Sequence, residues 1–189
     1  MLPWAEEQYK KLRASAPNPN ANPPQQVNPA WSGCIPEGPT ELMRGGAFEL
    51  LQFPDVVLLL FNNDHAVRRV YLDGRGHPAN LQPTPVGHSV GKYEGDTLVV
   101  DTVGLSDKTW IDGQGYPHTD ALHLTERIRR VDQETMEIVM TMDDPKAYAK
   151  PWTKKIVHVL RPPGPNVWDN TECDELLRMG THYSAESKK

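Results

Sequence analysis

Several features that would assign this chain to a common class of protein are missing from its sequence. No apolar run approaches the roughly 18 residues that a membrane-spanning helix requires. Basic residues are not in excess: 20 Lys and Arg stand against 25 Asp and Glu, and the net charge of −5 argues against a general affinity for nucleic acid phosphates. HExxH and HxH motifs are absent, and the GRG and GQG segments at 74–76 and 113–115 are typical of turns rather than of phosphate-binding loops.

Cysteine is scarce, because Cys34 and Cys173 are the only two, 139 residues apart and without a CxxC or Cys/His spacing that would suggest zinc. Two alternatives follow from the residues. A disulfide would tie the N-terminal arm to the last core segment, with a loop-closure gain of roughly 4–5 kcal/mol; otherwise both are reduced thiols. Residues 1–30 lack the apolar region and cleavage site of a secretory signal, which favours a mature N-terminus behind an added Met1.

Proline, by contrast, is abundant, with 18 residues in 189, about twice the usual ~5%. This excludes a helical bundle, because a proline inside a helix removes a backbone donor and clashes with the preceding turn. Eight of the prolines fall in the first 40 residues, and Pro162, Pro163 and Pro165 form a second group. We therefore expect an N-terminal helix and wrapping arm over 1–46, a β-barrel domain over 47–175 and a C-terminal tail over 176–189.

The segment between the two proline groups alternates strand signals with turn residues. A short polar helix is expected at 3–14 and no regular structure at 15–40. Because the connections between most of the expected strands are short, neighbouring strands should be antiparallel and form a meander. The predicted fold is an all-β, up-and-down, calycin-like barrel of eight or nine strands, with a two-sheet sandwich as the alternative. The expected strands are 47–53, 56–63, 66–73, 88–94, 97–104, 122–131, 135–142, 153–160 and, more weakly, 166–173.

The loop 106–120 has the highest density of chemically active side chains, and it precedes a strand, so it should lie at one mouth of the barrel. His118 and Asp120 are two residues apart and would point the same way on an extended chain. We predict that Asp120 orients the His118 imidazole, which acts as a general base or acid. The alternative is a polar loop with a solvent-exposed histidine.

Strand alternation places Glu126 on an apolar face with Leu122, Leu124 and Ile128. A carboxylate inside the barrel must be paired, hydrogen-bonded or protonated. Glu126 is therefore a candidate second acid or base, the alternative being a structural ion pair with Arg68 or Arg69. Asp101 is expected to be a half-buried carboxylate by the same reasoning, because it shares a face with Val99 and Val103.

Aromatic side chains of two long loops would form the walls of a pocket for an apolar or aromatic ligand. The alternative is that these aromatic side chains only pack the two loops together at the rim. The methionine face that includes Met140 either lines the pocket or belongs to the core. His118, Asp120, His123 and Glu126 superficially resemble a set of metal ligands, but His123 and Glu126 point to opposite faces of a strand. His65, His77 and His88 could take part in a metal site only if the fold brought them together. No metal site is therefore predicted. The predicted ligand-binding residues are Trp110, Tyr116, Met140, Tyr148 and Trp152.

Four long segments between about residues 48 and 160 resemble a family of uncharacterised, mostly secreted bacterial proteins. Members of that family typically carry export signals, so the resemblance implies a periplasmic or extracellular location and favours the Cys34–Cys173 disulfide. It implies no reaction. The GKYEG segment at 91–95 is also similar to a glycine–aromatic pattern of calycin barrels, with Tyr93 where lipocalins usually have Trp. The four segments are FELLQFPDVVLLLFNNDHAVRRVYLDGRGHP, GHSVGKYEGDTLVVDTVGLSDKTW, GYPHTDALHLTERIRRVD and MDDPKAYAKPW.

These observations predict a secreted small-molecule-binding β-barrel with cofactor-independent acid–base chemistry, as in an isomerase, cyclase, lyase or hydrolase. The partner would be a small apolar or aromatic ligand, with no nucleic acid and no membrane span. Homo-oligomers and larger complexes stay open. The alternatives are a non-catalytic ligand carrier and an accessory subunit of a larger complex.

Overall fold

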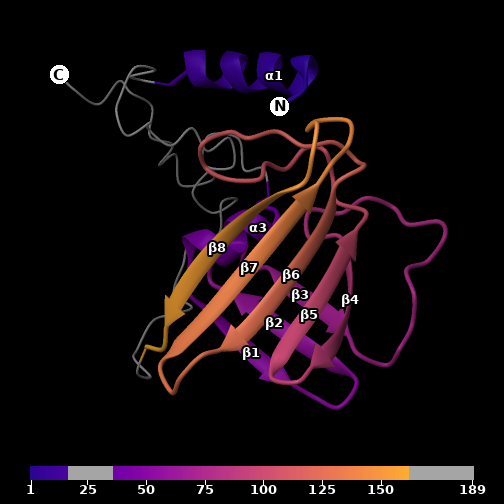
Figure 1. Ribbon diagram of the computed structural model, residues 1–189, viewed down its shortest axis with the longest axis vertical. Helices are drawn as coiled ribbons and strands as arrows, with labels where there is room; N and C mark the ends of the chain where they lie inside the picture. The colour runs from indigo at the N-terminus through magenta and orange to yellow at the C-terminus, as the bar shows by residue number, and fades with distance from the viewer. Residues whose placement is uncertain (17–35, 162–189) are drawn as a thin grey trace, which may run out of the picture.

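Eight β-strands follow one another along the chain and form one curled sheet, a half-barrel (Figure 1). The structure is a computed structural model, and it describes residues 1–16 and 36–161. In the sheet the strands lie in their sequence order, from the first to the eighth. They are β1 (Phe48–Gln52), β2 (Val56–Phe61), β3 (Val67–Tyr71), β4 (His88–Glu94), β5 (Thr97–Val103), β6 (His123–Arg130), β7 (Thr135–Asp143) and β8 (Trp152–Val159).

The expected strands between residues 47 and 160 are confirmed, each to within two residues at either end. They form because apolar side chains recur at every second position and cover the concave face. On β7, for example, Ile138, Met140 and Met142 are fully buried, so the methionine face belongs to the core. The weak strand expected at 166–173 lies outside the described residues, as do Cys34 and Cys173.

The expectation of a wholly antiparallel meander is wrong at one place. β3 and β4 pair in parallel, through Val70 with Ser89 and Tyr71 with Val90. A parallel pair needs a connection of a dozen or more residues to carry the chain back, and residues 72–87 provide it. The sheet therefore consists of two antiparallel blocks, β1–β3 and β4–β8, joined by this short parallel contact.

A short helix, α3 (Pro39–Gly45), begins inside the arm that was expected to be irregular as far as residue 40. Proline at the first position of a helix is favourable, because its fixed φ suits the helix and its missing N–H would be unpaired there anyway. Seven residues are too few for a stable isolated helix, and α3 is held by packing: Leu42 and Met43 are fully buried in the core.

The same helix lies behind β8 in Figure 1. The Nε2 atom of His158, on β8, lies 2.6 Å from the Met43 carbonyl oxygen. The His158 ring also meets the Phe48 ring of β1 edge to face, with centroids 5.1 Å apart. Side chains and α3 thus connect β8 to β1, which stand at opposite ends of the order of strands in the described sheet.

The helix predicted at 3–14 is confirmed as α1 (Pro3–Ala14), which lies above one end of the half-barrel (Figure 1). Its exposed side carries two ion pairs at i,i+4 spacing, Glu6 with Lys10 and Glu7 with Lys11. Beneath it are the β5–β6 loop and the β7–β8 loop, so this end of the sheet is a covered rim. In the described residues no helix has both the length and the apolar character needed to cross a membrane.

Candidate functional site: a histidine–aspartate cluster on the outer face

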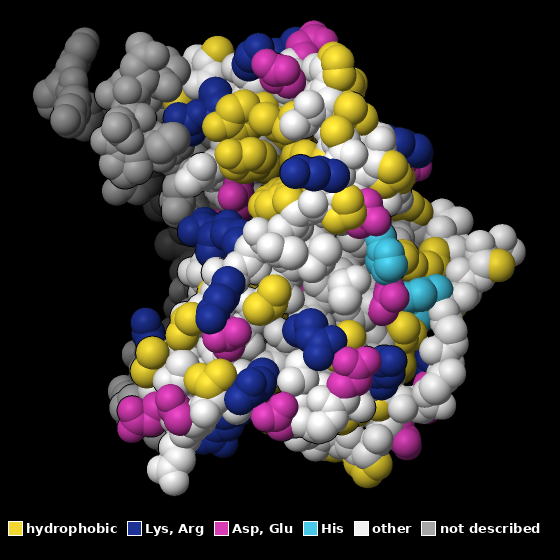
Figure 2. All heavy atoms as spheres, in the orientation of Figure 1, with side chains coloured by type: hydrophobic (Ala, Val, Ile, Leu, Met, Phe, Trp, Pro, Cys, Tyr) yellow, Lys and Arg dark blue, Asp and Glu magenta, His cyan; other side chains and the backbone are white. Residues whose placement is uncertain are grey.

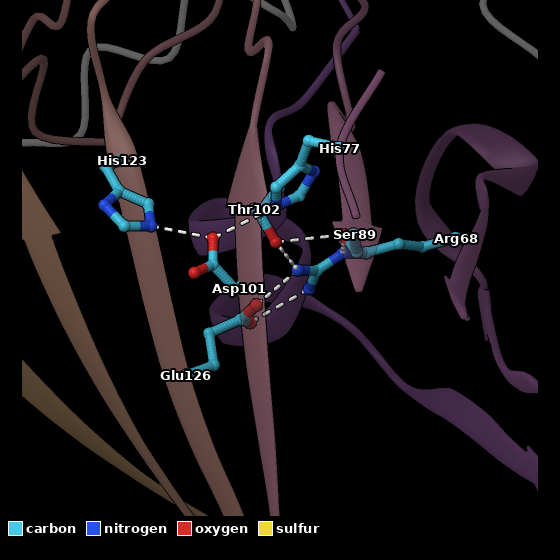
Figure 3. A network of polar contacts seen from close by, with 7 residues as sticks. All are labelled: Arg68, His77, Ser89, Asp101, Thr102, His123 and Glu126. Atoms are coloured by element: carbon cyan, nitrogen blue, oxygen red, sulfur yellow. Dashed lines mark hydrogen bonds and ion pairs between the residues drawn. The ribbon is translucent and has the colours of Figure 1, made fainter. Parts of the chain in front are cut away.

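The interior of the half-barrel contains an ion pair between Arg68 of β3 and Glu126 of β6 (Figure 3). Arg68 Nη1 donates to Glu126 Oε1 at 2.9 Å, and Nη2 donates to Oε2. Arg68 Nη2 also donates to Thr102 Oγ1 at 2.7 Å, and its Nε donates to Ser89 Oγ at 3.0 Å. The Arg68 and Glu126 side chains are 1% and 0% exposed.

This network confirms the expected interior position of Glu126 and identifies Arg68, not the exposed Arg69, as its partner. Both carboxylate oxygens are engaged by the guanidinium, which offsets the cost of burying the charges. The geometry is that of the structural ion pair. A catalytic role for Glu126 stays a prediction.

The loop residue His118 is also buried, with 3% exposure. Its Nδ1 lies 3.0 Å from the Thr119 carbonyl oxygen, and its Nε2 lies 2.8 Å from Thr109 Oγ1. Burial lowers the pKa of His118 and outweighs the contact with the Thr119 carbonyl, which raises it. His118 is therefore held as a neutral imidazole with both ring nitrogens occupied.

The predicted pair between His118 and Asp120 is not formed. Asp120 instead binds Lys146 at 2.8 Å in an exposed ion pair that lowers the pKa of its carboxyl group. The prediction assumed an extended chain, but a turn closed by the Leu122 N–H and the Thr119 carbonyl oxygen begins between the two residues. The Asp144 carboxylate fixes this turn by accepting from the backbone N–H and the hydroxyl of Thr119.

A different group of side chains meets on the outer face, and we call His77, His88, Asp101 and His123 the histidine–aspartate cluster. Asp101 Oδ1 lies 2.7 Å from His123 Nε2 and 3.2 Å from His77 Nε2. The Nδ1 atoms of His77 and His88 are 2.8 Å apart. Figure 3 shows the imidazoles of His77 and His123 on either side of the Asp101 carboxylate.

The strand register explains how these residues meet. β5 lies between β4 and β6, and Asp101 pairs with Val90 on one side and Thr125 on the other. His88 and His123 are two residues away from those partners, so all three side chains emerge on the same face. His77 reaches the cluster from the long β3–β4 connection.

The hydrogen bonds define the tautomers that the neutral rings must adopt. Asp101 Oδ1 accepts from both Nε2 atoms, so His77 and His123 carry their protons there. His77 Nδ1 then accepts from His88 Nδ1–H, which leaves lone pairs on His88 Nε2 and His123 Nδ1. Burial, followed by electrostatic interactions with His77 and Arg75, lowers the pKa of His88 and keeps it neutral at neutral pH.

The cluster is accessible to solvent, in contrast to His118 and Glu126. The His77, Asp101 and His123 side chains are 22%, 45% and 44% exposed, which agrees with the expectation that Asp101 is half-buried. Figure 2 shows histidine side chains next to an acidic one on this face of the molecule. In residues 1–16 and 36–161, no group of three or more His, Cys, Asp or Glu side chains is arranged to hold a metal ion.

An aromatic and cationic margin borders the cluster on the side of β3. The Tyr71 ring stacks on His88, with centroids 5.4 Å apart, and the Arg75 guanidinium lies 4.0 Å from the centre of the Tyr71 ring. Arg75 is held there by Asp73, which accepts from its Nε at 2.8 Å. The margin therefore offers a planar surface beside the neutral His88 imidazole.

The predicted ligand-binding residues are only partly brought together. Three of them meet at the rim, where the Trp152 ring contacts both Tyr116 and Tyr148. The ring centroids are 6.0 Å apart for Tyr116 and Trp152 and 5.7 Å apart for Tyr148 and Trp152. Trp110 is half-buried on the same loop and forms a β-bridge with Pro117. Met140 is fully buried in the core, opposite Glu126.

Sequence reasoning identified Asp101 as half-buried but did not group it with the histidines. The Gly95-Asp96 turn fixes the register of the β4–β5 hairpin, and this register already makes His88 a diagonal neighbour of Asp101. His77 and His123 could not be found this way, because their positions depend on the long connection and on the β5–β6 pairing. Comparison with family models, with curated proteins and with solved structures found nothing that matches this chain.

Proposed function

We propose that this protein is a small-molecule-binding β-barrel-like protein that carries out acid–base chemistry at the histidine–aspartate cluster without a cofactor. One observation carries the proposal: a single oxygen of Asp101 binds two solvent-accessible imidazoles, His77 at 3.2 Å and His123 at 2.7 Å. A carboxylate that accepts from an imidazole N–H fixes the tautomer and stabilises the imidazolium formed when the other nitrogen takes a proton.

The roles follow from the tautomers. His123 Nδ1 and His88 Nε2 carry lone pairs and act as bases, and Asp101 compensates the positive charge that develops on His123. Proton removal from an acidic C–H or from water, followed by its return at another atom, covers isomerisation, cyclisation, elimination and hydrolysis. His118 and Asp120, which the sequence favoured, have other partners.

A general-base probe tests the proposal before the natural substrate is known. In 5-nitrobenzisoxazole, removal of the C3 proton breaks the N–O bond and releases 2-cyano-4-nitrophenolate, whose absorbance is measured. We expect the full-length chain to accelerate this reaction, and His123→Asn or Asp101→Asn to reduce the rate 10²- to 10⁴-fold, the usual contribution of a positioned base. His118→Asn should have little effect.

Three results would contradict the proposal. Equal rates for the parent and for Asp101→Asn would remove the cluster from the reaction. Loss of activity in His118→Asn alone would return the site to the β5–β6 loop. Dependence on an added divalent metal would overturn the cofactor-independent mechanism.

A non-catalytic ligand carrier is the second candidate function, and the contacts among Tyr116, Tyr148 and Trp152 at the rim favour it. Binding of an apolar aromatic molecule with no turnover of any acid–base probe would support this alternative.

A periplasmic or secreted location and the Cys34–Cys173 disulfide are also part of the proposal. Their support is the resemblance of the sequence to exported proteins. Alkylation of the unreduced protein followed by mass measurement should leave both cysteines unmodified. Alkylation of both would show two free thiols and would contradict the disulfide.

A further inference from the structure

Four aromatic side chains from separate segments meet at the covered rim of the half-barrel, and we call them the rim aromatics: Tyr9, Tyr116, Tyr148 and Trp152. Tyr9 of α1 lies 5.0 Å from Tyr116 between ring centroids, and Tyr116 lies 6.0 Å from Trp152 of β8. Figure 2 shows hydrophobic side chains gathered at this end of the molecule. Trp152 belongs to β8, which lies on the opposite side of β7 from β6, the strand that carries His123 of the histidine–aspartate cluster.

The rim aromatics differ in how their polar atoms are satisfied. Tyr148 donates its hydroxyl proton to the Pro117 carbonyl oxygen at 2.8 Å, and burial raises the pKa of this phenol. Trp152 Nε1 is buried and has no hydrogen-bond partner among the described residues. A buried donor without an acceptor costs about 1–3 kcal/mol, and such groups in native proteins call for a specific explanation.

Helix α1 meets the rim through the Tyr9 ring, which contacts Tyr116, and through Ala5, which is fully buried in the core. α1 presents a narrow face to the rim, along which Ala5 and Arg13 are buried, while Trp4 and both Glu–Lys pairs are exposed. Its N-terminal attachment is one backbone hydrogen bond, from Leu2 N–H to the Ala147 carbonyl oxygen at 2.7 Å. A helix of 12 residues is marginal in water on its own, so its position depends on these contacts.

We propose that α1 covers a binding site for a planar aromatic molecule that carries an oxygen acceptor. In the covered state the Tyr9 ring lies tilted against Tyr116. When α1 moves aside, the aromatic ligand takes the place of the Tyr9 ring and accepts a hydrogen bond from Trp152 Nε1. Tyr116 and Trp152 then provide the aromatic surfaces for the ligand. The site is distinct from the histidine–aspartate cluster and does not depend on it.

The competition between Tyr9 and the ligand gives the proposal two opposite signatures. Trp152→Phe keeps a ring but removes the donor, so binding should weaken. Tyr9→Ala removes the group that occupies the site, so binding should tighten. If Tyr9 were part of the pocket wall, Tyr9→Ala would weaken binding as Trp152→Phe does. The opposite direction of the two effects therefore identifies Tyr9 as a cover.

Isothermal titration of the full chain with 7-hydroxycoumarin, a planar molecule with a carbonyl acceptor, tests these signatures. We expect about a tenfold rise in Kd for Trp152→Phe, the loss of one hydrogen bond, and a fall in Kd for Tyr9→Ala. Trp110 lies on the β5–β6 loop with Tyr116 but is not one of the rim aromatics. Trp110→Phe is therefore the matched control and should bind coumarin like the parent. His123→Asn should also leave the Kd for coumarin unchanged. A failure of the acid–base proposal at the histidine–aspartate cluster can therefore be distinguished from a failure of the rim site.

Absence of coumarin binding, an unchanged Kd in Trp152→Phe, or weaker binding in Tyr9→Ala would each overturn the proposal. An NMR measurement avoids the objection that Trp152→Phe folds poorly. The indole N–H resonance of Trp152, assigned by its disappearance in Trp152→Phe, should shift when coumarin is added to the parent protein. A shift confined to the other tryptophans would also overturn the site.

Discussion

Arg68 and Glu126 meet across the interior of the half-barrel, 58 residues apart in sequence, with side chains that are 1% and 0% exposed. Arg68 belongs to the β1–β3 block and Glu126 to the β4–β8 block. The pair therefore joins the two antiparallel parts of the sheet, whose direct strand pairing in the described sheet is a parallel contact of two residue pairs.

Removing one member of this pair should be strongly destabilising. Glu126→Ala leaves the Arg68 charge buried without a counter-ion, and such changes cost about 3–5 kcal/mol. The double variant Arg68→Met/Glu126→Leu should recover most of the lost stability, because no uncompensated charge remains. Urea unfolding of the parent, the single variant and the double variant measures these changes. A loss below ~1 kcal/mol in Glu126→Ala would show that water hydrates the Arg68 guanidinium in the variant and would contradict the prediction.

The two aspartates near Thr119 should differ sharply in their contribution to stability. Asp144 is 1% exposed and accepts from Thr119, Lys146 and Ala147, so Asp144→Ala should cost about 2–3 kcal/mol. Asp120 forms an exposed ion pair, and Asp120→Ala should change the unfolding free energy by less than ~1 kcal/mol. Thermal unfolding of both variants is the measurement, and equal losses would contradict these assignments.

Stability should fall when the solution is acidified, because burial lowers the pKa of both His118 and His88. The unfolded chain then binds more protons than the folded protein. The contribution of the neutral rings is complete above about pH 6.5, the unfolded value, and decreases as the pH falls toward the lowered folded values. Urea unfolding at pH 7.5 and pH 5 measures the decrease.

The variant His118→Asn should show a smaller decrease between these pH values than the parent. His65→Asn, on the exposed β2–β3 turn, is the control and should keep the decrease of the parent. If His118→Asn keeps the full decrease, the buried imidazole of His118 is not its source.

Two glycines with positive φ separate backbone strain from crowding. Gly74 has φ of 78° and open space where a Cβ would lie, so Gly74→Ala should cost about 1–2 kcal/mol. Gly87 has φ of 66°, and its Cβ would lie 2.7 Å from the Val103 carbonyl oxygen. Gly87→Ala should therefore be the more destabilising, by several kcal/mol in urea unfolding; similar losses would mean that the β4–β5 end moves freely to accept a methyl group.

Asp101 should matter for chemistry far more than for folding. Its side chain is 45% exposed, so Asp101→Asn should change the unfolding free energy by less than ~1 kcal/mol. The same variant should lose most of the base-catalysed opening of 5-nitrobenzisoxazole. Parallel measurement of unfolding and rate checks this, and a rate that fell only together with stability would indicate a structural residue.

Local patterns predicted the strands and the side that each residue faces. Glu126 was placed in the interior because alternation on β6 depends on neighbouring residues alone, and the structure confirms that position. The half-burial of Asp101, which shares a face of its strand with Val99 and Val103, was predicted in the same way. These inferences succeeded because a strand repeats every two residues regardless of what it packs against.

Relationships between distant segments were harder to predict. The parallel pairing of β3 with β4 depends on how residues 72–87 return, and α3 depends on burial of Leu42 and Met43 rather than on helix propensity. The expected pairing of His118 with Asp120 failed because Asp144, 25 residues from Thr119 in the sequence, fixes a turn between them. His77 entered the cluster through the same long connection that the sequence left undefined.

The parallel junction between β3 and β4 also has a consequence for dividing the chain. A cut within residues 78–82 interrupts no antiparallel hairpin, so β1–β3 and β4–β8 each keep a contiguous antiparallel ladder on its own polypeptide. Reassembly of two such fragments would restore the short parallel pair and the Arg68–Glu126 contact together. The fold is thereby suited to fragment complementation, with the buried ion pair acting as the recognition element between the halves.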